Sequence, residues 1–114
     1  MDELVAKVAS AAGIDQATAR KAVVIILQFL ANAAPRDKVA ALAAAVPGIA
    51  PVIADAADGP SDLMGAFGAL TAAGLGMGEV QSVATAFGDA ARDHVGAETF
   101  DGIVAGVPGL SQFV

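Results

Sequence analysis

The segment that follows Asp15 has the pattern of apolar and polar positions expected of a helix. Apolar side chains recur in it with a period of about 3.6 residues, which places them on one helical face; they are Ala19, Ala22, Val23, Ile26, Phe29, Leu30 and Ala33. Val24, Ile25 and Leu27 lie outside this stripe, so the helix is apolar around most of its circumference, as a central helix is. We therefore predict a buried central helix that Asp15 caps at its N-terminus and that ends near Ala33.

Glycine and proline residues mark the ends of the neighbouring helices in the first half of the chain. A first helix is expected over about Asp2–Ala12, followed by Gly13 as a left-handed C-terminal residue. Pro35 suits the first turn of a third helix, where its missing N–H costs nothing, and this helix extends to about Ala45. Pro47 then ends it, because the residue before a proline avoids the helical conformation.

The same pattern returns after an offset of 61 residues. Gly13-Ile14 corresponds to Gly74-Leu75, and "AVPGI" at residues 45–49 corresponds to "GVPGL" at residues 106–110. The two copies align from the first pair to the second without a gap. We interpret this as an internal duplication, because similar residues at a fixed spacing are the signature of a repeat. The second copy predicts three further helices, at about Leu63–Ala73, Gly78–His94 and Ala97–Ala105.

The duplication sets the expected domain organisation. By length the chain is one domain of 114 residues, with a first repeat over about 1–54, a linker over about 55–62 and a second repeat over about 63–114. No stretch alternates apolar and polar residues as a half-buried strand does. The predicted fold class is therefore all-α, a six-helix domain made of two three-helix repeats with pseudo-twofold symmetry. Leu110 and Phe113 are expected to be docked, because they would otherwise lie in water.

The repeated patterns "GID…AVPGI" and "GLG…GVPGL" resemble those of small bacterial all-helical domains of unknown function. In such domains a Gly–aliphatic pair opens a helix pair that closes on a Leu- or Val-Pro motif. The resemblance covers nearly the whole chain. It implies a bacterial origin and an all-α fold, and it carries over no catalytic residue.

The charge and composition exclude several classes of function. A net charge of −6 argues against binding to nucleic acids and to anionic membranes, because both use Lys and Arg. The absence of cysteine excludes disulfides, thiolate catalysis and cysteine-ligated metals. The first residues, "MDELVAKVASAAG", lack the apolar run of a signal peptide. A membrane-spanning helix needs about 20 consecutive apolar residues, and every apolar run in the chain is interrupted before it reaches that length. A cytoplasmic protein is therefore expected.

Two segments have the composition of a ligand-binding loop without its spacing. "GLGMG" at residues 74–78 is rich in glycine, but a dinucleotide fingerprint needs G-x-G-x-x-G after a strand. We expect it to connect two helices. "DAADGPSD" at residues 55–62 is acidic. A calcium loop needs oxygen ligands at positions 1, 3 and 5, but a loop that starts at Asp55 has Ala57 at position 3 and Gly59 at position 5, and neither has a side-chain oxygen. We expect it to be a solvated linker.

His94 is the only histidine, and it follows an apolar face at the C-terminal end of its helix. A capping or packing role is expected there, because the helix dipole favours an imidazolium. Asp93, Glu98 and Asp101 lie nearby in sequence and leave a mixed metal site as the alternative. Asp89 and Asp93 share a helix face, but an acid–base pair needs a pocket that shifts its pKa values. We assign no catalytic, cofactor-binding or metal-ligating residue, and we expect that the protein is not an enzyme.

The surplus of apolar residues points to an interface. Hydrophobic residues make up 56% of the chain, and the mean hydropathy is +0.67. Our leading interpretation is a non-catalytic structural or protein-interaction domain that associates with itself or with a protein partner. Such a domain is expected to expose apolar residues outside the core stripes, such as Val24 and Ile25. The alternative is a carrier of an apolar or lipid-like small molecule between the two repeats, where helix bundles host ligands. No cofactor is expected.

Overall fold

The computed structural model describes residues 2–46, 48–54 and 59–107, and every regular element in these residues is a helix. The seven helices of this part of the chain are α1 (Asp2–Ala12), α2 (Gln16–Ala33), α3 (Arg36–Ala45), α4 (Ala50–Ala54), α5 (Leu63–Ala72), α6 (Met77–Val95) and α7 (Ala97–Ala105). The predicted all-α class is confirmed. The six predicted helices are found as α1 to α3 and α5 to α7, and each begins and ends close to its predicted residues.

Helix α4 was not predicted from the sequence pattern, so the predicted count of six helices is wrong. Gly48, which lies between α3 and α4, has a φ of +90°. Pro51 lies in the first turn of α4, where a missing N–H costs no hydrogen bond. The N–H of Ile53 donates to the carbonyl of Ile49 at 3.0 Å. A helix of one turn is too short to show an apolar period, and for this reason the pattern indicates only a turn.

The ends of the first two helices have the local structure that the sequence predicts. Gly13 has a φ of +69°, and the N–H of Ile14 behind it donates to the carbonyl of Ala9 at 3.1 Å, as in a Schellman motif. The carboxylate of Asp15 accepts a hydrogen bond of 2.7 Å from the N–H of Thr18. The predicted N-cap of α2 is therefore confirmed.

The connection between α5 and α6 is the glycine-rich segment at residues 74–78. Gly74 has a φ of +100°, and the N–H of Leu75 donates to the carbonyl of Leu70 at 3.3 Å. The N–H of Gly76 donates to Oε1 of Glu79 at 3.0 Å. The prediction that this segment connects two helices is confirmed.

Some predictions concern residues outside the described part of the chain. They are the turn at Pro47, the docking of Leu110 and Phe113, and residues 55–58 of the linker. The described end of the linker contacts α2, because Asn32 Nδ2 donates to the carbonyl of Pro60 at 3.1 Å. The linker ends at Asp62, whose carboxylate caps α5 by accepting from the N–H of Gly65 at 2.7 Å.

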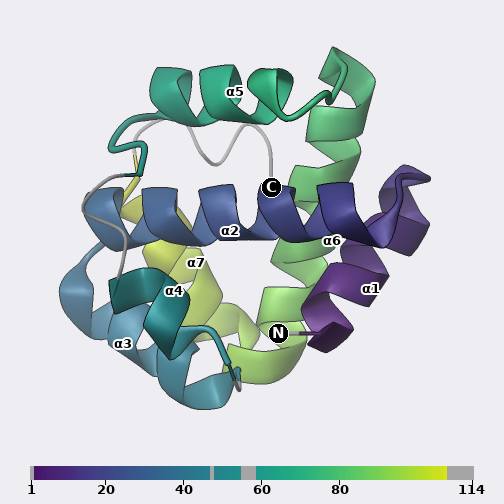
Figure 1. Ribbon diagram of the computed structural model, residues 1–114. Helices are drawn as coiled ribbons and strands as arrows, with labels where there is room; N and C mark the ends of the chain where they lie inside the picture. The colour runs from purple at the N-terminus through teal and green to yellow at the C-terminus, as the bar shows by residue number, and fades with distance from the viewer. Residues whose placement is uncertain (1, 47, 55–58, 108–114) are drawn as a thin grey trace.

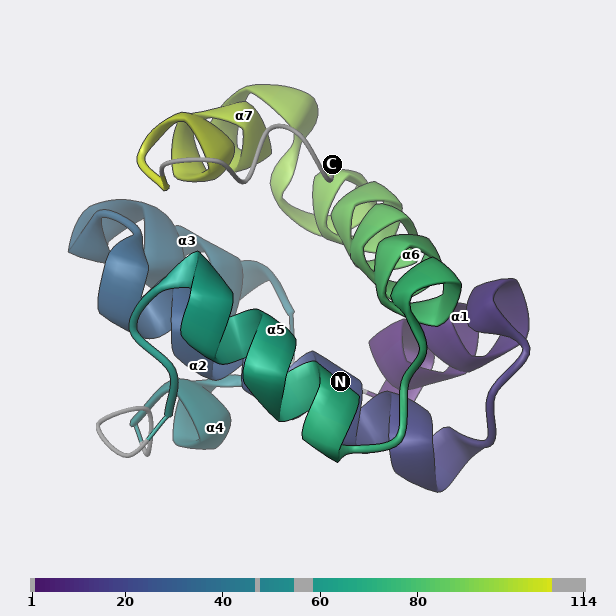
Figure 2. The same cartoon turned by 90° about the horizontal axis from the view of Figure 1, so that it is seen from above.

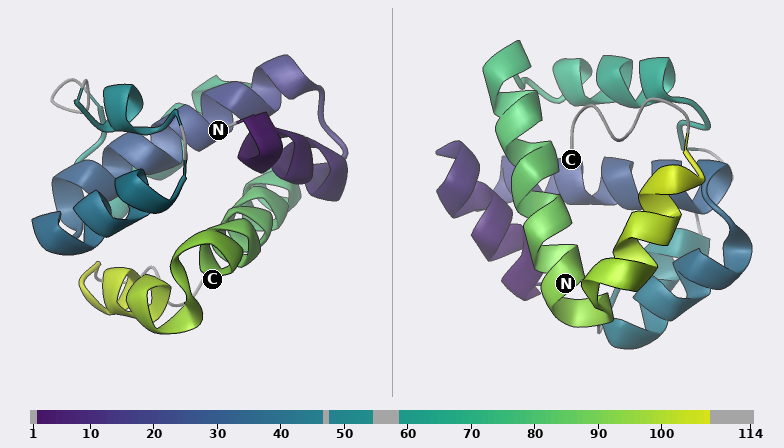
Figure 3. Two further views of the ribbon diagram at one scale, coloured as in Figure 1. Left: turned by 90° about the horizontal axis from the view of Figure 1, so that it is seen from below. Right: turned by 180° about the vertical axis from the view of Figure 1, so that it is seen from behind.

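The two long helices, α2 and α6, cross each other, and each has a shorter helix from the other half of the chain beside it (Figure 1). Helix α5 lies along α2, and α1 lies along α6 (Figures 1 and 3). Helices α3 and α7 contact each other, and α4 contacts α2 and α3. Seen from above, α5 and α6 diverge from the connection that joins them (Figure 2), and their axes are bent by 115°.

One continuous apolar core joins these helices. Its largest fully buried side chains come from α1, α2, α3, α6 and α7 and from the turn before α4; they include Leu4, Leu27, Leu42, Ile49, Phe87, Phe100 and Ile103. Among the described residues, no polar or charged residue is buried. In the same residues no single helix is long and apolar enough to cross a membrane, and α5 and α6 meet that test only as a pair across their bend.

Candidate functional site

An apolar pocket of about 50 Å³ lies where α2, α5, α6 and α7 meet. Its lining residues are Ile26, Phe29, Leu30, Leu63, Ala66, Phe67, Leu70, Val80, Ala84, Phe87 and Phe100. None of these side chains carries a polar or charged group. All four phenylalanines of the described residues belong to the lining, so the aromatic side chains of this part of the chain are concentrated around one small space.

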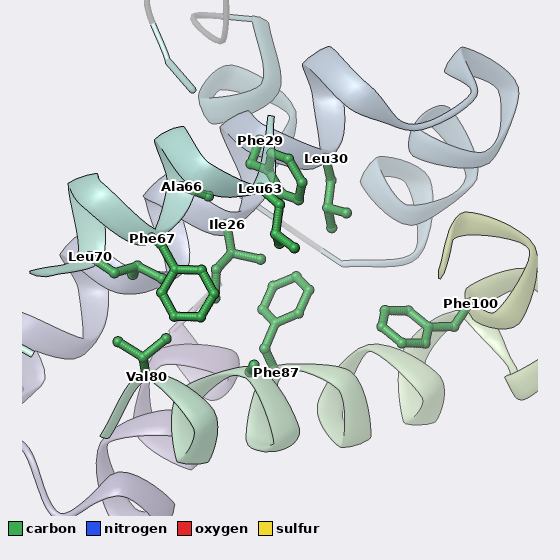
Figure 4. Close-up of a pocket in the computed structure, with 11 residues that line it drawn as sticks. Ile26, Phe29, Leu30, Leu63, Ala66, Phe67, Leu70, Val80, Phe87 and Phe100 are labelled. Atoms are coloured by element: carbon green, nitrogen blue, oxygen red, sulfur yellow. The ribbon is translucent and has the colours of Figure 1, made fainter. Parts of the chain in front are cut away.

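The aromatic rings reach the pocket from different helices. In Figure 4, Phe67 points from α5 toward Val80 on α6, Phe87 points from α6 into the space beside α5, and Phe100 points toward the same space from α7. Phe87 and Phe100 are buried, whereas Phe67 is half-buried. Phe67 therefore lies where the pocket meets the surface.

The pocket results from the divergence of α5 and α6 and from the small residues that they place between them. Helix α5 buries only Ala66 and Leu70. Ala66 and Ala84, on the two diverging helices, each contribute a single methyl group to the wall. Atoms that line a void lack contacts on one side and lose dispersion energy. An apolar guest would restore those contacts.

Arg92 is a cation beside the pocket wall, and its charge is already balanced. Its guanidinium carbon lies 5.0 Å from the ring centroid of Phe100, which is a cation–π contact. The same guanidinium lies 3.2 Å from the carboxylate of Asp101 and 3.9 Å from that of Asp89. Arg92 is not among the lining residues. It holds α6 to α7 outside the pocket.

His94 contacts α1 and does not gather the acidic residues that lie near it in sequence. Its Nε2 is 3.9 Å from Oε2 of Glu3. Asp93 pairs with Lys7 at 3.1 Å, and Asp101 belongs to the guanidinium cluster described above. In residues 2–46, 48–54 and 59–107, no group of three or more His, Asp or Glu side chains could hold a metal ion. The capping or packing role of His94 stays a prediction.

Two carboxyl groups of the described chain have clearly lowered pKa values, and both lie at the ends of helices. A hydrogen bond from Arg20, helped by its charge, lowers the pKa of Asp2. Hydrogen bonds from the side chain and backbone of Thr18 lower the pKa of Asp15. Neither carboxylate lines the pocket. These shifts reflect local structure and do not prepare a group for acid–base catalysis.

Val24 and Ile25 do not form the exposed apolar face that was expected of an interaction surface. Both are half-buried, and Ile25 packs against the core. The physical reason is the central position of α2, which contacts α1, α3, α4, α5 and α6. The large apolar side chains that the described structure leaves exposed are Met64 and Met77, at 80% and 77%.

Sequence reasoning placed a possible ligand between the two halves of the chain, but it identified no pocket residue. Phe67 and Phe87 cannot be assigned to a pocket from the sequence, because a helical stripe does not show which helix it faces. The available signal was indirect. A chain with few aromatic residues carries Phe67 and Phe87 on consecutive predicted helices that also hold small residues.

Known proteins offer no further guide. No protein-family model, curated protein or solved structure matches the chain. The resemblance to small bacterial helical domains stays a prediction from the sequence. The function is therefore argued from the pocket itself.

Proposed function

We propose that this protein binds an apolar small molecule in the pocket between α2, α5, α6 and α7. The observation that carries the proposal is the lining, to which the described residues contribute only apolar side chains, including all four of their phenylalanines. Binding sites for small molecules are mostly apolar and lie between helices in helical proteins. The proposal assigns no catalytic step to the chain.

The distribution of apolar residues also supports this function. The large apolar side chains are gathered in the core and around the pocket, while the described surface exposes only Met64 and Met77 among them. Proteins that associate through apolar surfaces present contiguous exposed patches. The surplus of apolar residues in this chain is therefore better explained by its interior than by a large docking face.

We further propose that the chain consists of two repeats and that the pocket lies between them. Helices α1, α2 and α3 begin 61 residues before α5, α6 and α7 respectively. Gly13 and Gly74 both have a positive φ, and the hydrogen bond from Ile14 to Ala9 has its counterpart from Leu75 to Leu70. On this division, α2 of the first repeat and three helices of the second form the pocket walls.

Two matched variants of α5 test the proposed binding. Ala66→Leu adds three carbon atoms inside the pocket, whereas Ala72→Leu adds the same atoms at an exposed position of the same helix. We would measure the mass of each protein by native mass spectrometry, first as purified without denaturant and then after addition of toluene. We expect the wild type and Ala72→Leu to carry bound mass on the 11.1 kDa chain, and Ala66→Leu to lose it.

The outcome that would contradict the proposal is a bare wild-type chain under both conditions. Equal retention by Ala66→Leu and Ala72→Leu would contradict it as well, because the bound molecule would then lie elsewhere. Far-UV circular dichroism of each variant confirms that the helices have formed, so that loss of binding is not caused by unfolding.

Self-association is the second candidate, and the exposure of Met64 and Met77 is the observation that favours it. Methionine side chains make adaptable apolar contacts. The same mass spectra test this candidate through multiples of the chain mass, and replacement of both residues by Gln would abolish the multiples. A cytoplasmic location and a bacterial origin stay predictions of the sequence.

A further inference from the structure

We infer that the pocket takes a neutral, compact hydrocarbon group of about one ring, and not the carboxylate or extended chain of a fatty acid. This inference rests on the proposed binding function and names the chemical class of the ligand. It follows from three properties of the site: the chemistry of its walls, the charges around it and its size.

The described residues of the walls offer no partner to a polar group. Phe29, Phe67, Phe87 and Phe100 supply four aromatic rings, and the remaining lining side chains are aliphatic. A polar group buried there would lose its hydrogen bonds to water without replacement. Aromatic rings pack favourably against one another edge to face or offset. The walls therefore favour a ring that carries no buried polar substituent.

The charges around the pocket oppose a carboxylate ligand. None of the six Lys and Arg residues of the chain lines the pocket. Arg92 contacts the ring of Phe100 from outside, but Asp89 and Asp101 already pair with it. An anionic head group would have to displace these carboxylates in a chain whose net charge is −6. Neutral molecules meet no such cost.

The size of the pocket limits the ligand to a compact group. Its volume of about 50 Å³ is smaller than the apolar cavities of about 150 Å³ that hold benzene. A ring can therefore enter only if wall residues move. Leu63 and Phe67 are the half-buried members of the wall on α5, and a small outward turn of these side chains enlarges the site. An acyl chain of eight or more carbons occupies more volume than one ring, so its entry would need a larger movement of the wall.

A titration with three probes of similar carbon number tests the inference. Toluene supplies a neutral ring, 1-octanol a neutral chain and octanoate a charged chain. The readout is the methyl chemical shifts of Leu63, Leu70 and Val80 in the full-length protein, measured by NMR at constant pH and ionic strength. We expect a saturable change with toluene at a dissociation constant at least tenfold lower than that of either chain probe.

The control variants are Ala66→Leu and Ala72→Leu, and we expect only the first to remove the toluene response. If Ala66→Leu fails to fold, Ala84→Leu fills the pocket from α6 instead. Tighter binding of octanoate than of toluene would overturn the neutral ligand class, and tighter binding of 1-octanol would overturn the ring. In both cases the proposed binding function would stand. The absence of a response to all three probes would contradict that function itself.

Discussion

Helices α1 and α5 both pack beside a long helix of the other half of the chain, yet they bury very different surfaces. Helix α1 buries Leu4, Val5, Val8 and Ala9 against its neighbours. Helix α5 buries only Ala66 and Leu70. Helix α1 is in close contact with both α6 and α2, whereas α5 has its main contact with α2 and diverges from α6 (Figure 2).

This difference shows that the same helical arrangement packs closely on one side and leaves an apolar pocket on the other. Buried apolar side chains join α1 to its neighbours, so that interface contributes stability. The hollows beside it, between α1 and α6, are open and have polar or charged side chains in their walls. The methyl groups of Ala66 and Ala84 leave space between α5 and α6. Substitutions at paired positions on α1 and α5 test this comparison.

Leu4→Ala is expected to cost more stability than Leu70→Ala. Leu4 is 1% exposed in the packed interface, and Leu70 is 5% exposed beside the pocket. Truncating a buried leucine costs about 2–5 kcal/mol, and we expect Leu4→Ala to fall near the middle of that range. Leu70→Ala should cost about 1 kcal/mol less, because Leu70 already lacks contacts on its pocket side. Urea unfolding monitored by circular dichroism measures both, and equal losses would refute the difference in packing.

Adding volume should have opposite consequences on the two sides. Ala9 lies in the packed interface of α1, so we expect Ala9→Leu to destabilise the protein by about 1–3 kcal/mol through overpacking. Ala66→Leu has the pocket to expand into, and its free energy of unfolding should stay within about 1 kcal/mol of the wild type. The same urea titrations give the answer. A large loss from Ala66→Leu would mean that α5 has no free space beside it.

The N-cap of α2 should contribute stability that depends on pH. Asp15→Ala removes the hydrogen bond to the N–H of Thr18, and we expect a lower Tm at pH 7. Because folding lowers the pKa of Asp15 below its ordinary value of 3.8, this contribution is present above that value. It is lost as the pH falls through the lower pKa of the folded state. Thermal melts from pH 7 to 2 should show the two proteins converging only at the acidic end.

The ion pair between α1 and α6 should have the smallest effect. Lys7 and Asp93 are 3.1 Å apart and largely exposed, and α5 carries no charged residue that could form a counterpart. We expect Lys7→Ala to reduce stability by less than about 1 kcal/mol, because solvent screens exposed pairs. Unfolding in low and high salt checks this expectation. A loss that persists in 1 M NaCl would show that packing of the Lys7 stem, rather than its charge, is responsible.

The features that could be predicted from sequence are local ones. Gly13 and Asp15 mark the boundary between α1 and α2 because backbone conformation and capping depend on a few neighbouring residues. Helix α4 was missed, because a single turn that contains Pro51 has no period to recognise. The expected exposure of Val24 and Ile25 was wrong, because burial depends on how many neighbours surround α2.

The amino-acid sequence is enough to predict that this protein is helical, where its long helices begin and end, and which chemistries it lacks, such as those of cysteine. These properties depend on residue type and on spacing along a few turns. Only the tertiary structure decided that α1 lies along α6 and α5 along α2, and that four phenylalanines surround one pocket. Such contacts join residues far apart in the chain, and they depend on side-chain volumes and on the directions of the helices, which a periodic pattern does not record.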